Sequence, residues 1–161
     1  MEMFSGSLHL VQLDRDWTPN DDAQVRNMSQ EAEKRTAAGQ IAEEIVLAAE
    51  KDRLSKAGRA YLADKVESVA DRPGLGYDIK SFEQDDTPRF IEVKNISKSD
   101  RFFLSEGEWQ NSRKRTNYWF YLVSAADSRR PKVSCLPAEK LQPAHLQPVQ
   151  YVVRAQIKAK A

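Results

Sequence analysis

The chain has 161 residues, of which 40% are hydrophobic and 30% charged, as in one globular domain. Its one cysteine, Cys135, excludes an internal disulfide and a cysteine-based zinc site, and its two histidines lie too far apart in sequence to suggest a histidine-rich metal site. No stretch approaches the ~18 apolar residues of a membrane span, and the first residues lack a secretory pattern. We therefore expect a cytoplasmic protein without membrane association.

The net charge of +1 conceals an uneven distribution. Residues 1–50 carry ten acidic and four basic side chains, whereas residues 51–161 carry fourteen acidic and twenty-one basic ones. This excludes a uniformly basic, nucleic-acid-binding coat. It allows a local basic face on the later two thirds of the chain.

The first half of the chain predicts an arm followed by a long helix. Residues 1–28 have no clear pattern, and we interpret them as an N-terminal arm or accessory strand. Good helix formers predict a helix from about residue 29 to about residue 56, with Gly58 as its stop. Residues that recur at helical spacing predict its apolar stripe, which Val46 and Leu47 widen: Ile41, Ile45, Ala48 and Ala49.

The middle of the chain predicts a hairpin and a second helix. Residues 59–70 fit a helix or a strand equally well. Residues 77–83 and 89–95 alternate as strands, and the turn-forming residues 84–88 connect them. Ser105 and Glu108 form a capping box, which predicts a helix to about residue 115. The aromatic run at residues 118–123 predicts a strand that is buried on both faces.

Residues 131–161 contain four prolines, which predict a C-terminal extension that is mostly loop, with an edge strand at residues 149–153. The resulting organisation is an arm (1–28), a core (29–130) and an extension (131–161). The order helix, strand, strand, helix, strand predicts an α/β sandwich around a mixed central sheet flanked by helices.

Three side chains on the predicted hairpin suggest chemistry. Glu92 and Lys94 are two apart on one strand, so both project from the same face. A turn across residues 84–88 brings Asp78 opposite Glu92 or Lys94. Two carboxylates, with the main-chain carbonyl of Val93, are ligands suited to Mg²⁺. Lys94 could then orient or deprotonate an attacking water, or stabilise charge that develops on a phosphate. The alternative interpretation is an ordinary cross-strand ion pair.

The sequence around these three residues resembles that of a known family. Residues 76–79 and 90–94 (GYDI and FIEVK) resemble the PD-(D/E)XK nuclease superfamily, and most closely its branch named for the C-terminal domain of the protein NO VEIN. The chain is also similar to Mrr-type endonuclease domains. Residues 42–46, 102–109 and 118–123 resemble further motifs of the branch, so the resemblance covers roughly residues 37–125.

This resemblance implies a restriction-endonuclease-like αβββαβ core and a Mg²⁺-dependent endonuclease, with Mn²⁺ as a substitute. Asp78 and Glu92 match the metal-binding carboxylates, and Lys94 matches the catalytic lysine. Glu43 matches an acidic residue that the first helix contributes, with Glu44 as the alternate, because Ala42 stands where the branch usually has glycine. The expected activity is hydrolysis of DNA in restriction, anti-phage defence or repair.

Several alternatives and partners stay open at this stage. Five basic residues downstream of Lys94 are candidates for DNA contact: Lys98, Arg101, Arg113, Lys114 and Arg115. Those near residue 115 could instead complement the helix C-terminus. We interpret Glu108 as a capping residue rather than a catalyst. Double-strand cleavage would need a homodimer or two successive events. The alternatives are a non-catalytic module of the same fold that acts with a partner ATPase or helicase, and an interaction protein that binds through residues 1–28.

Overall fold

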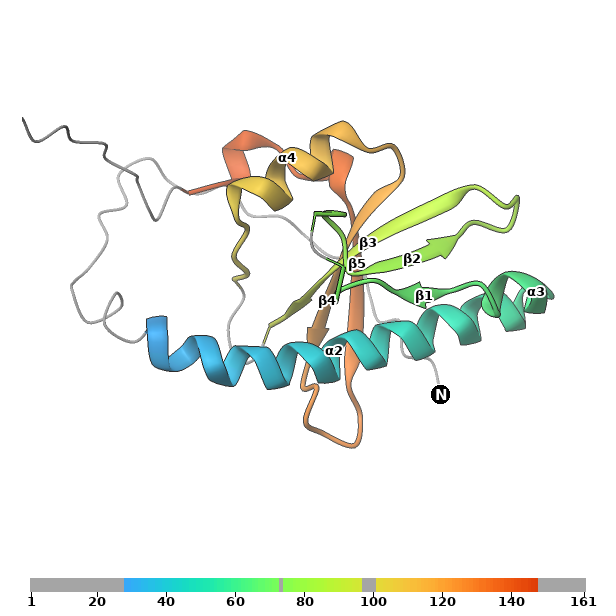
Figure 1. Ribbon diagram of the computed structural model, residues 1–161, viewed down its shortest axis with the longest axis horizontal. Helices are drawn as coiled ribbons and strands as arrows, with labels where there is room; N and C mark the ends of the chain where they lie inside the picture. Colours follow the sequence, from blue (N-terminus) through green and yellow to red (C-terminus); the bar gives the residue numbers. More distant parts are fainter. Residues whose placement is uncertain (1–27, 73, 97–100, 148–161) are drawn as a thin grey trace, which may run out of the picture.

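The computed structural model describes residues 28–72, 74–96 and 101–147 (Figure 1). Almost all of the expected N-terminal arm, the expected strand at residues 149–153, and Lys98 lie outside these residues. The described elements follow the order helix, three strands, helix, two strands, with a short helix after the first. The expected α/β class and αβββαβ order are confirmed. Within the described residues, no helix has the length and apolar character that crossing a membrane requires.

Within the described part of the chain, a five-stranded mixed sheet is the centre of the fold, with strands in the order β1-β2-β3-β4-β5. Only β3 and β4 run parallel, and all other neighbours are antiparallel. The parallel pair is joined through the helix α4, as such connections require. The strands are β1 (Glu67–Ser68), β2 (Ile79–Phe82), β3 (Pro88–Asn95), β4 (Tyr118–Ser124) and β5 (Lys132–Pro137).

The helix α2 (Met28–Lys56) lies along one face of the sheet, and α4 (Glu106–Lys114) lies on the other side (Figure 1). The end of α2 is closed as predicted, since Gly58 has a φ of +73° and Arg59 N donates to Leu54 O at 2.8 Å. Residues 59–70, for which the sequence fitted a helix or a strand, form one of each: the short helix α3 (Ala60–Ala63) is followed by β1.

The buried stripe of α2 agrees with the predicted one at Val46 and Ala49 and differs from it elsewhere. Its fully or nearly fully buried residues are Ala42, Val46, Ala49, Glu50 and Leu54. Ile41 is 43% exposed and Ala48 is also exposed, so that part of the prediction was wrong. Adjacent apolar residues left the phase of the stripe undetermined, and the buried face includes a carboxylate that a hydrophobic pattern does not reveal.

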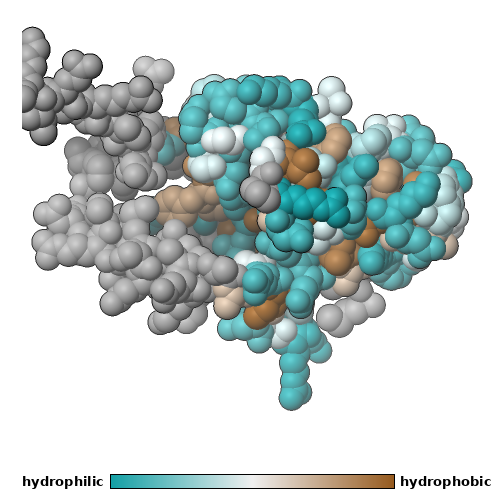
Figure 2. Space-filling view, viewed as in Figure 1, coloured by the Kyte–Doolittle hydropathy of each residue, from teal (hydrophilic) through white to brown (hydrophobic). Residues whose placement is uncertain are grey.

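Alternate residues of the central strands fill two separate cores. Toward α2, a cluster contains Ile91 of β3 with Tyr121 and Val123 of β4. Toward α4, a second cluster contains Tyr118, Phe120 and Leu122 of β4, with Trp109 of α4 and Phe90 of β3 packed against it. This two-sided burial confirms the prediction for residues 118–123. The face of the molecule seen in Figure 2 is mostly hydrophilic, with small hydrophobic patches, as expected when the apolar residues are divided between two inner cores.

The strand β5 was not anticipated, because the prolines around it indicated a loop. Pro131 precedes the strand and Pro137 ends it, so neither removes a hydrogen bond from its interior. Val133 and Leu136 are buried on the opposite faces of the sheet. The sheet therefore continues past residue 130.

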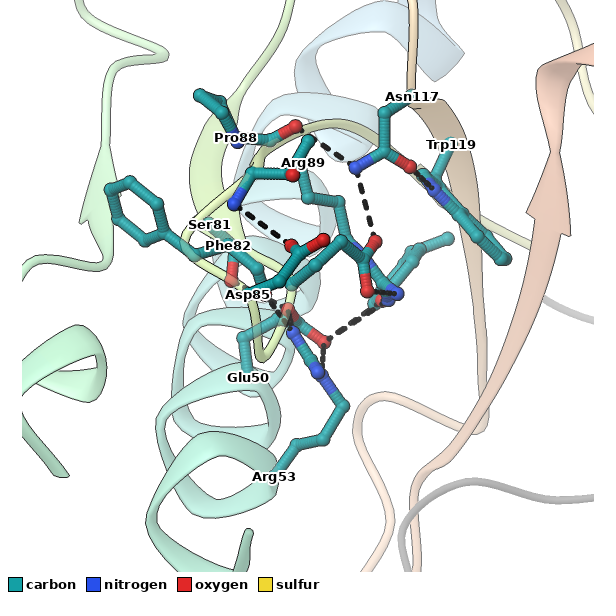
Figure 3. A network of polar contacts seen from close by, with 12 residues as sticks. Glu50, Arg53, Ser81, Phe82, Asp85, Pro88, Arg89, Asn117 and Trp119 are labelled. Carbon is teal, nitrogen blue, oxygen red and sulfur yellow. Dashed lines mark hydrogen bonds and ion pairs between the residues drawn. The ribbon is translucent and has the colours of Figure 1, made fainter. Parts of the chain in front are cut away.

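A buried polar network attaches α2 to the sheet (Figure 3). The Glu50 carboxylate is fully buried and accepts hydrogen bonds from Arg53 Nε at 2.8 Å and Arg53 Nη2 at 2.7 Å. It also accepts from Ser81 Oγ of β2 at 2.6 Å and from Tyr121 Oη of β4 at 2.8 Å. Arg53 donates further to the carbonyl of Phe82 at 2.6 Å. One side chain thus connects a helix to two strands.

The network continues to the start of β3. Arg89 donates to Tyr121 Oη at 2.5 Å and to both oxygens of Glu83 at 2.7 and 2.8 Å. Its guanidinium lies 4.4 Å from the ring centre of Trp119. Asn117 donates to Glu83 at 3.0 Å and accepts from Trp119 Nε1 at 2.7 Å. These contacts fix the far end of the hairpin that carries the candidate site.

Candidate active site

The candidate site lies at the point where β2 begins and β3 continues beyond it. The register pairs Ile79 with Ile91, which extends to Asp78 opposite Glu92 and confirms the predicted hairpin. Asp78 N donates to Ile91 O at 2.9 Å, and the Asp78 carboxylate accepts from Val93 N at 2.8 Å. Because the N–H and C=O of one strand residue point to the same side, the Val93 carbonyl faces the β2 side of β3 as well.

Glu92 and Lys94 lie side by side, as the strand spacing predicted. Lys94 Nζ lies 3.0 Å from Glu92 Oε1 and 2.6 Å from Glu108 Oε2 of α4. The other oxygen of Glu92 lies 3.3 Å from the hydroxyl of Tyr118, which also donates to Gly76 O at 2.9 Å. The side chains of Glu92 and Lys94 are only 8% and 16% exposed, so this cluster is largely shielded from water.

The electrostatics indicate an excess of buried negative charge. Burial, followed by the charge of Asp78, raises the pKa of Glu92 to about 8. Burial also raises the pKa of Asp78, although the Val93 amide and Lys94 act against it. Burial alone would lower the pKa of Lys94, but the charges of Glu92 and Glu108 outweigh it and raise that pKa. Lys94 is therefore an ammonium, and one ammonium does not neutralise the neighbouring carboxylates.

The residues present fit a hard divalent cation. Asp78 and Glu92 supply two carboxylates that burial and mutual repulsion destabilise, and a cation between them would relieve both effects. Across the described parts of the chain, no three His, Cys, Asp or Glu side chains form a metal-binding group. The donors would be two carboxylates, the Val93 carbonyl and water, a set that suits Mg²⁺, which retains several waters.

The structure places Glu43 rather than Glu44 near the site. Glu43 is partly buried on α2, and burial, the charge of Asp78 and then that of Glu44 raise its pKa. Glu44 is exposed. Of the two alternatives that the sequence left open, Glu43 is thus the one within electrostatic reach of Asp78.

The predicted DNA-contacting residues separate into two groups. Arg113 donates to the carbonyl of Ala138 and stacks on Trp109 at 4.3 Å. Arg115 donates to the carbonyl of Leu75 at 2.8 Å and stacks on Tyr77 at 4.9 Å. Both arginines therefore contribute to packing around α4. Arg101 and Lys114 are exposed, and the structure does not describe Lys98.

Two neighbours of the site escaped sequence reasoning. Tyr118 opens an aromatic run and therefore looked like a core residue, yet its hydroxyl reaches both Gly76 O and Glu92. Glu108 was predicted as a cap, and the capping box with Ser105 is present. Its contact with Lys94 is long-range and gives no local signal.

A comparison with known protein families identifies the family of this chain. The family model described as "Protein NO VEIN, C-terminal" matches residues 42–136, which is more than half of the chain and runs from α2 to β5. The match includes Glu43, Asp78, Glu92, Lys94 and Glu108. Neither the curated proteins nor the solved structures contain a match. The chain belongs to the NO VEIN C-terminal family.

Proposed function

We propose that the protein is a metal-dependent nuclease that hydrolyses phosphodiester bonds of DNA. The observation that carries this proposal is the shielded group of Asp78, Glu92 and Lys94 at the junction of β2 and β3. Its residue types, order and spacing resemble the PD-(D/E)XK pattern. A charge cluster that served stability alone would be less costly at the surface, because burying unequal charges is unfavourable.

Each residue of the candidate site would have its own role in the reaction. Asp78, Glu92 and the Val93 carbonyl would hold Mg²⁺ or Mn²⁺, and Glu43 would add negative charge beside Asp78. The chemistry that such a cation supplies is acidification of a neighbouring water and neutralisation of charge on the phosphate. Lys94 stays an ammonium, so its role is to stabilise charge that develops on the phosphate rather than to accept a proton.

Exposed basic residues would bind the phosphate backbone of the DNA. The candidates are Arg101 and Lys114, whose side chains are exposed, with Lys98 outside the described residues. Arg113 and Arg115 donate to protein carbonyls and stack on rings, and so contribute to packing around α4. Phosphate contacts give affinity that is independent of sequence and falls with salt. A single chain has one site and would nick one strand, so double-strand cleavage would require a homodimer. These features would suit cytoplasmic restriction, anti-phage defence or repair.

Cleavage of supercoiled plasmid and single-stranded DNA, with RNA in parallel, tests the proposal. Mg²⁺ or Mn²⁺ should support cutting and EDTA should abolish it. Asp78→Asn and Lys94→Met should each lower the rate ~100-fold or more, as loss of groups that stabilise a transition state does. Asp127→Asn and Lys140→Met make the same changes at exposed positions and should cut normally. Equal cutting by Asp78→Asn and its control would refute the proposed site.

The second candidate is a non-catalytic module of the same fold that binds nucleic acid or protein and acts with a partner ATPase or helicase. The contact that favours it is the pairing of Lys94 with both Glu92 and Glu108, since a lysine held by two carboxylates also serves as a structural ion-pair cluster. It predicts no metal-dependent cutting by the wild type and no calorimetric heat on adding Mn²⁺. DNA binding measured by fluorescence anisotropy would then be the same in Asp78→Asn.

A further inference from the structure

We propose that Glu108 is a positioning residue, which holds the Lys94 ammonium at a fixed place beside Glu92 for the cleavage reaction. The proposal rests on the nuclease function given above, and it adds to that function a residue from a different element. Asp78, Glu92 and Lys94 all belong to the β2–β3 hairpin, whereas Glu108 belongs to α4, the helix that connects the parallel strands β3 and β4.

The Glu108 carboxylate is fixed by its own helix. Its Oε2 accepts from Ser105 N at 3.0 Å, while Glu108 N donates to Ser105 Oγ at 3.2 Å. This reciprocal cap immobilises the side chain at the first turn of α4. The same oxygen accepts from Lys94 Nζ at 2.6 Å, which is shorter than either capping bond. An immobile acceptor therefore determines where the ammonium lies.

Glu108 also competes with Glu92 for the ion pair with the Lys94 ammonium. Among the described residues, only the carboxylates of Glu92 and Glu108 lie in ion-pair range of Lys94 Nζ. The shorter distance is to Glu108, 2.6 Å against 3.0 Å. Without the charge on Glu108, the ammonium would pair with Glu92 alone, whose Oε1 it already contacts at 3.0 Å. Glu108 thus shares the ammonium with Glu92 and holds it beside the metal-binding carboxylate.

Capping by itself does not require a carboxylate at this position. Glutamine serves equally well at the third position of a capping box, because its amide oxygen accepts from the N-cap amide. Glutamine carries no charge, however, and cannot hold an ammonium in an ion pair. Glu108→Gln therefore removes the proposed role and leaves the structural one in place.

Steady-state cleavage by Glu108→Gln and Glu106→Gln tests the proposal. Glu106 lies in the same first turn, and its described bond is with Gln110 at 2.8 Å, so its variant makes the same charge change away from Lys94. Glu108→Gln should lower kcat about 10- to 100-fold, as loss of an outer partner does, with KM unchanged. Glu106→Gln should match the wild type. Wild-type kcat in Glu108→Gln would overturn the proposal.

A spectroscopic measurement separates this proposal from the nuclease function. The ¹⁵N–¹H signal of the Lys94 ammonium, identified by its loss in Lys94→Met, should shift or disappear in Glu108→Gln and stay unchanged in Glu106→Gln. If the wild type cuts no substrate while this pattern holds, the nuclease function fails and the Lys94–Glu108 contact stands without a catalytic role. An unchanged signal in Glu108→Gln would overturn the positioning role whether or not the wild type cuts DNA.

Discussion

Replacing Glu50 by alanine should be among the most destabilising single substitutions in the described chain. The change removes one fully buried carboxylate and four hydrogen bonds, two from Arg53 and one each from Ser81 and Tyr121. The Ser81 and Tyr121 side chains are themselves fully buried, so water cannot easily replace the lost acceptor. Arg53 would lose its charge partner while its guanidinium stays only 21% exposed.

The expected magnitude follows from these contacts. Removing one partner of a buried ion pair costs ~3–5 kcal/mol, because the other charge is left uncompensated. For a domain of this length, each kcal/mol lowers the melting temperature by ~2–4 °C. Glu50→Ala should therefore melt at a temperature ~6–20 °C below that of the wild type. Glu50→Gln, which keeps the shape and one acceptor oxygen, should fall between the two proteins.

Urea unfolding followed by circular dichroism, together with calorimetry, measures these differences. Glu44→Ala is the matched control, because Glu44 lies on the same helix with its side chain exposed. That substitution should change the free energy of unfolding by no more than ~0.5 kcal/mol. A loss below ~1 kcal/mol in Glu50→Ala would refute the reasoning, since it would mean that the network contributes no more than an exposed ion pair.

Two further predictions concern the site itself. Because burial and the charge of Asp78 raise the pKa of Glu92 from 4.5 to about 8, the stability that its proton contributes is complete below the lower value and lost as the pH rises through the higher one. The urea midpoint of Glu92→Gln minus that of the wild type should therefore increase as the pH rises from about 5 to about 9. A difference that stays constant with pH would contradict the raised pKa of Glu92. At Gly76, where φ is +75°, an added Cβ would collide with the Asn111 side chain, whereas at Gly74 (φ +92°) it would meet open space. Gly76→Ala should thus lower the free energy of unfolding by ~1–3 kcal/mol more than Gly74→Ala, and equal losses in urea unfolding would show that Asn111 moves aside without cost.

The parts of the site that could be predicted from sequence depend on local rules. The spacing of Glu92 and Lys94 places them on one face of any strand, and the turn at residues 84–88 determines the register that brings Asp78 opposite Glu92. The cap at Ser105 is likewise contained within four consecutive residues. Each of these features needs no knowledge of the rest of the chain.

The features that sequence reasoning missed depend on contacts between distant elements. Glu50 is buried because donors from β2 and β4 reach it, 31 and 71 residues away. Tyr118 reaches Gly76 across 42 residues. The strand β5 exists because its two faces complete two cores that other elements build. The type of a residue and its neighbours in sequence do not identify these distant partners. Sequence reasoning therefore predicts that a polar residue is exposed and that an aromatic residue belongs to the core.

Two carboxylates, Glu50 and Glu108, attach helices to opposite faces of the same sheet, and their burial shows what each one does. Glu50 is fully buried, and all its described partners are protein donors, so its contribution is to stability. Glu108 is 27% exposed, and its charge is directed at Lys94, next to two carboxylates that already repel each other. Besides burial, the charge of Glu108 raises the pKa of both Asp78 and Glu92, so this third carboxylate adds to the repulsion that disfavours their charged forms. The arrangement around Lys94 is therefore consistent with the proposed chemistry of a cation and a phosphate.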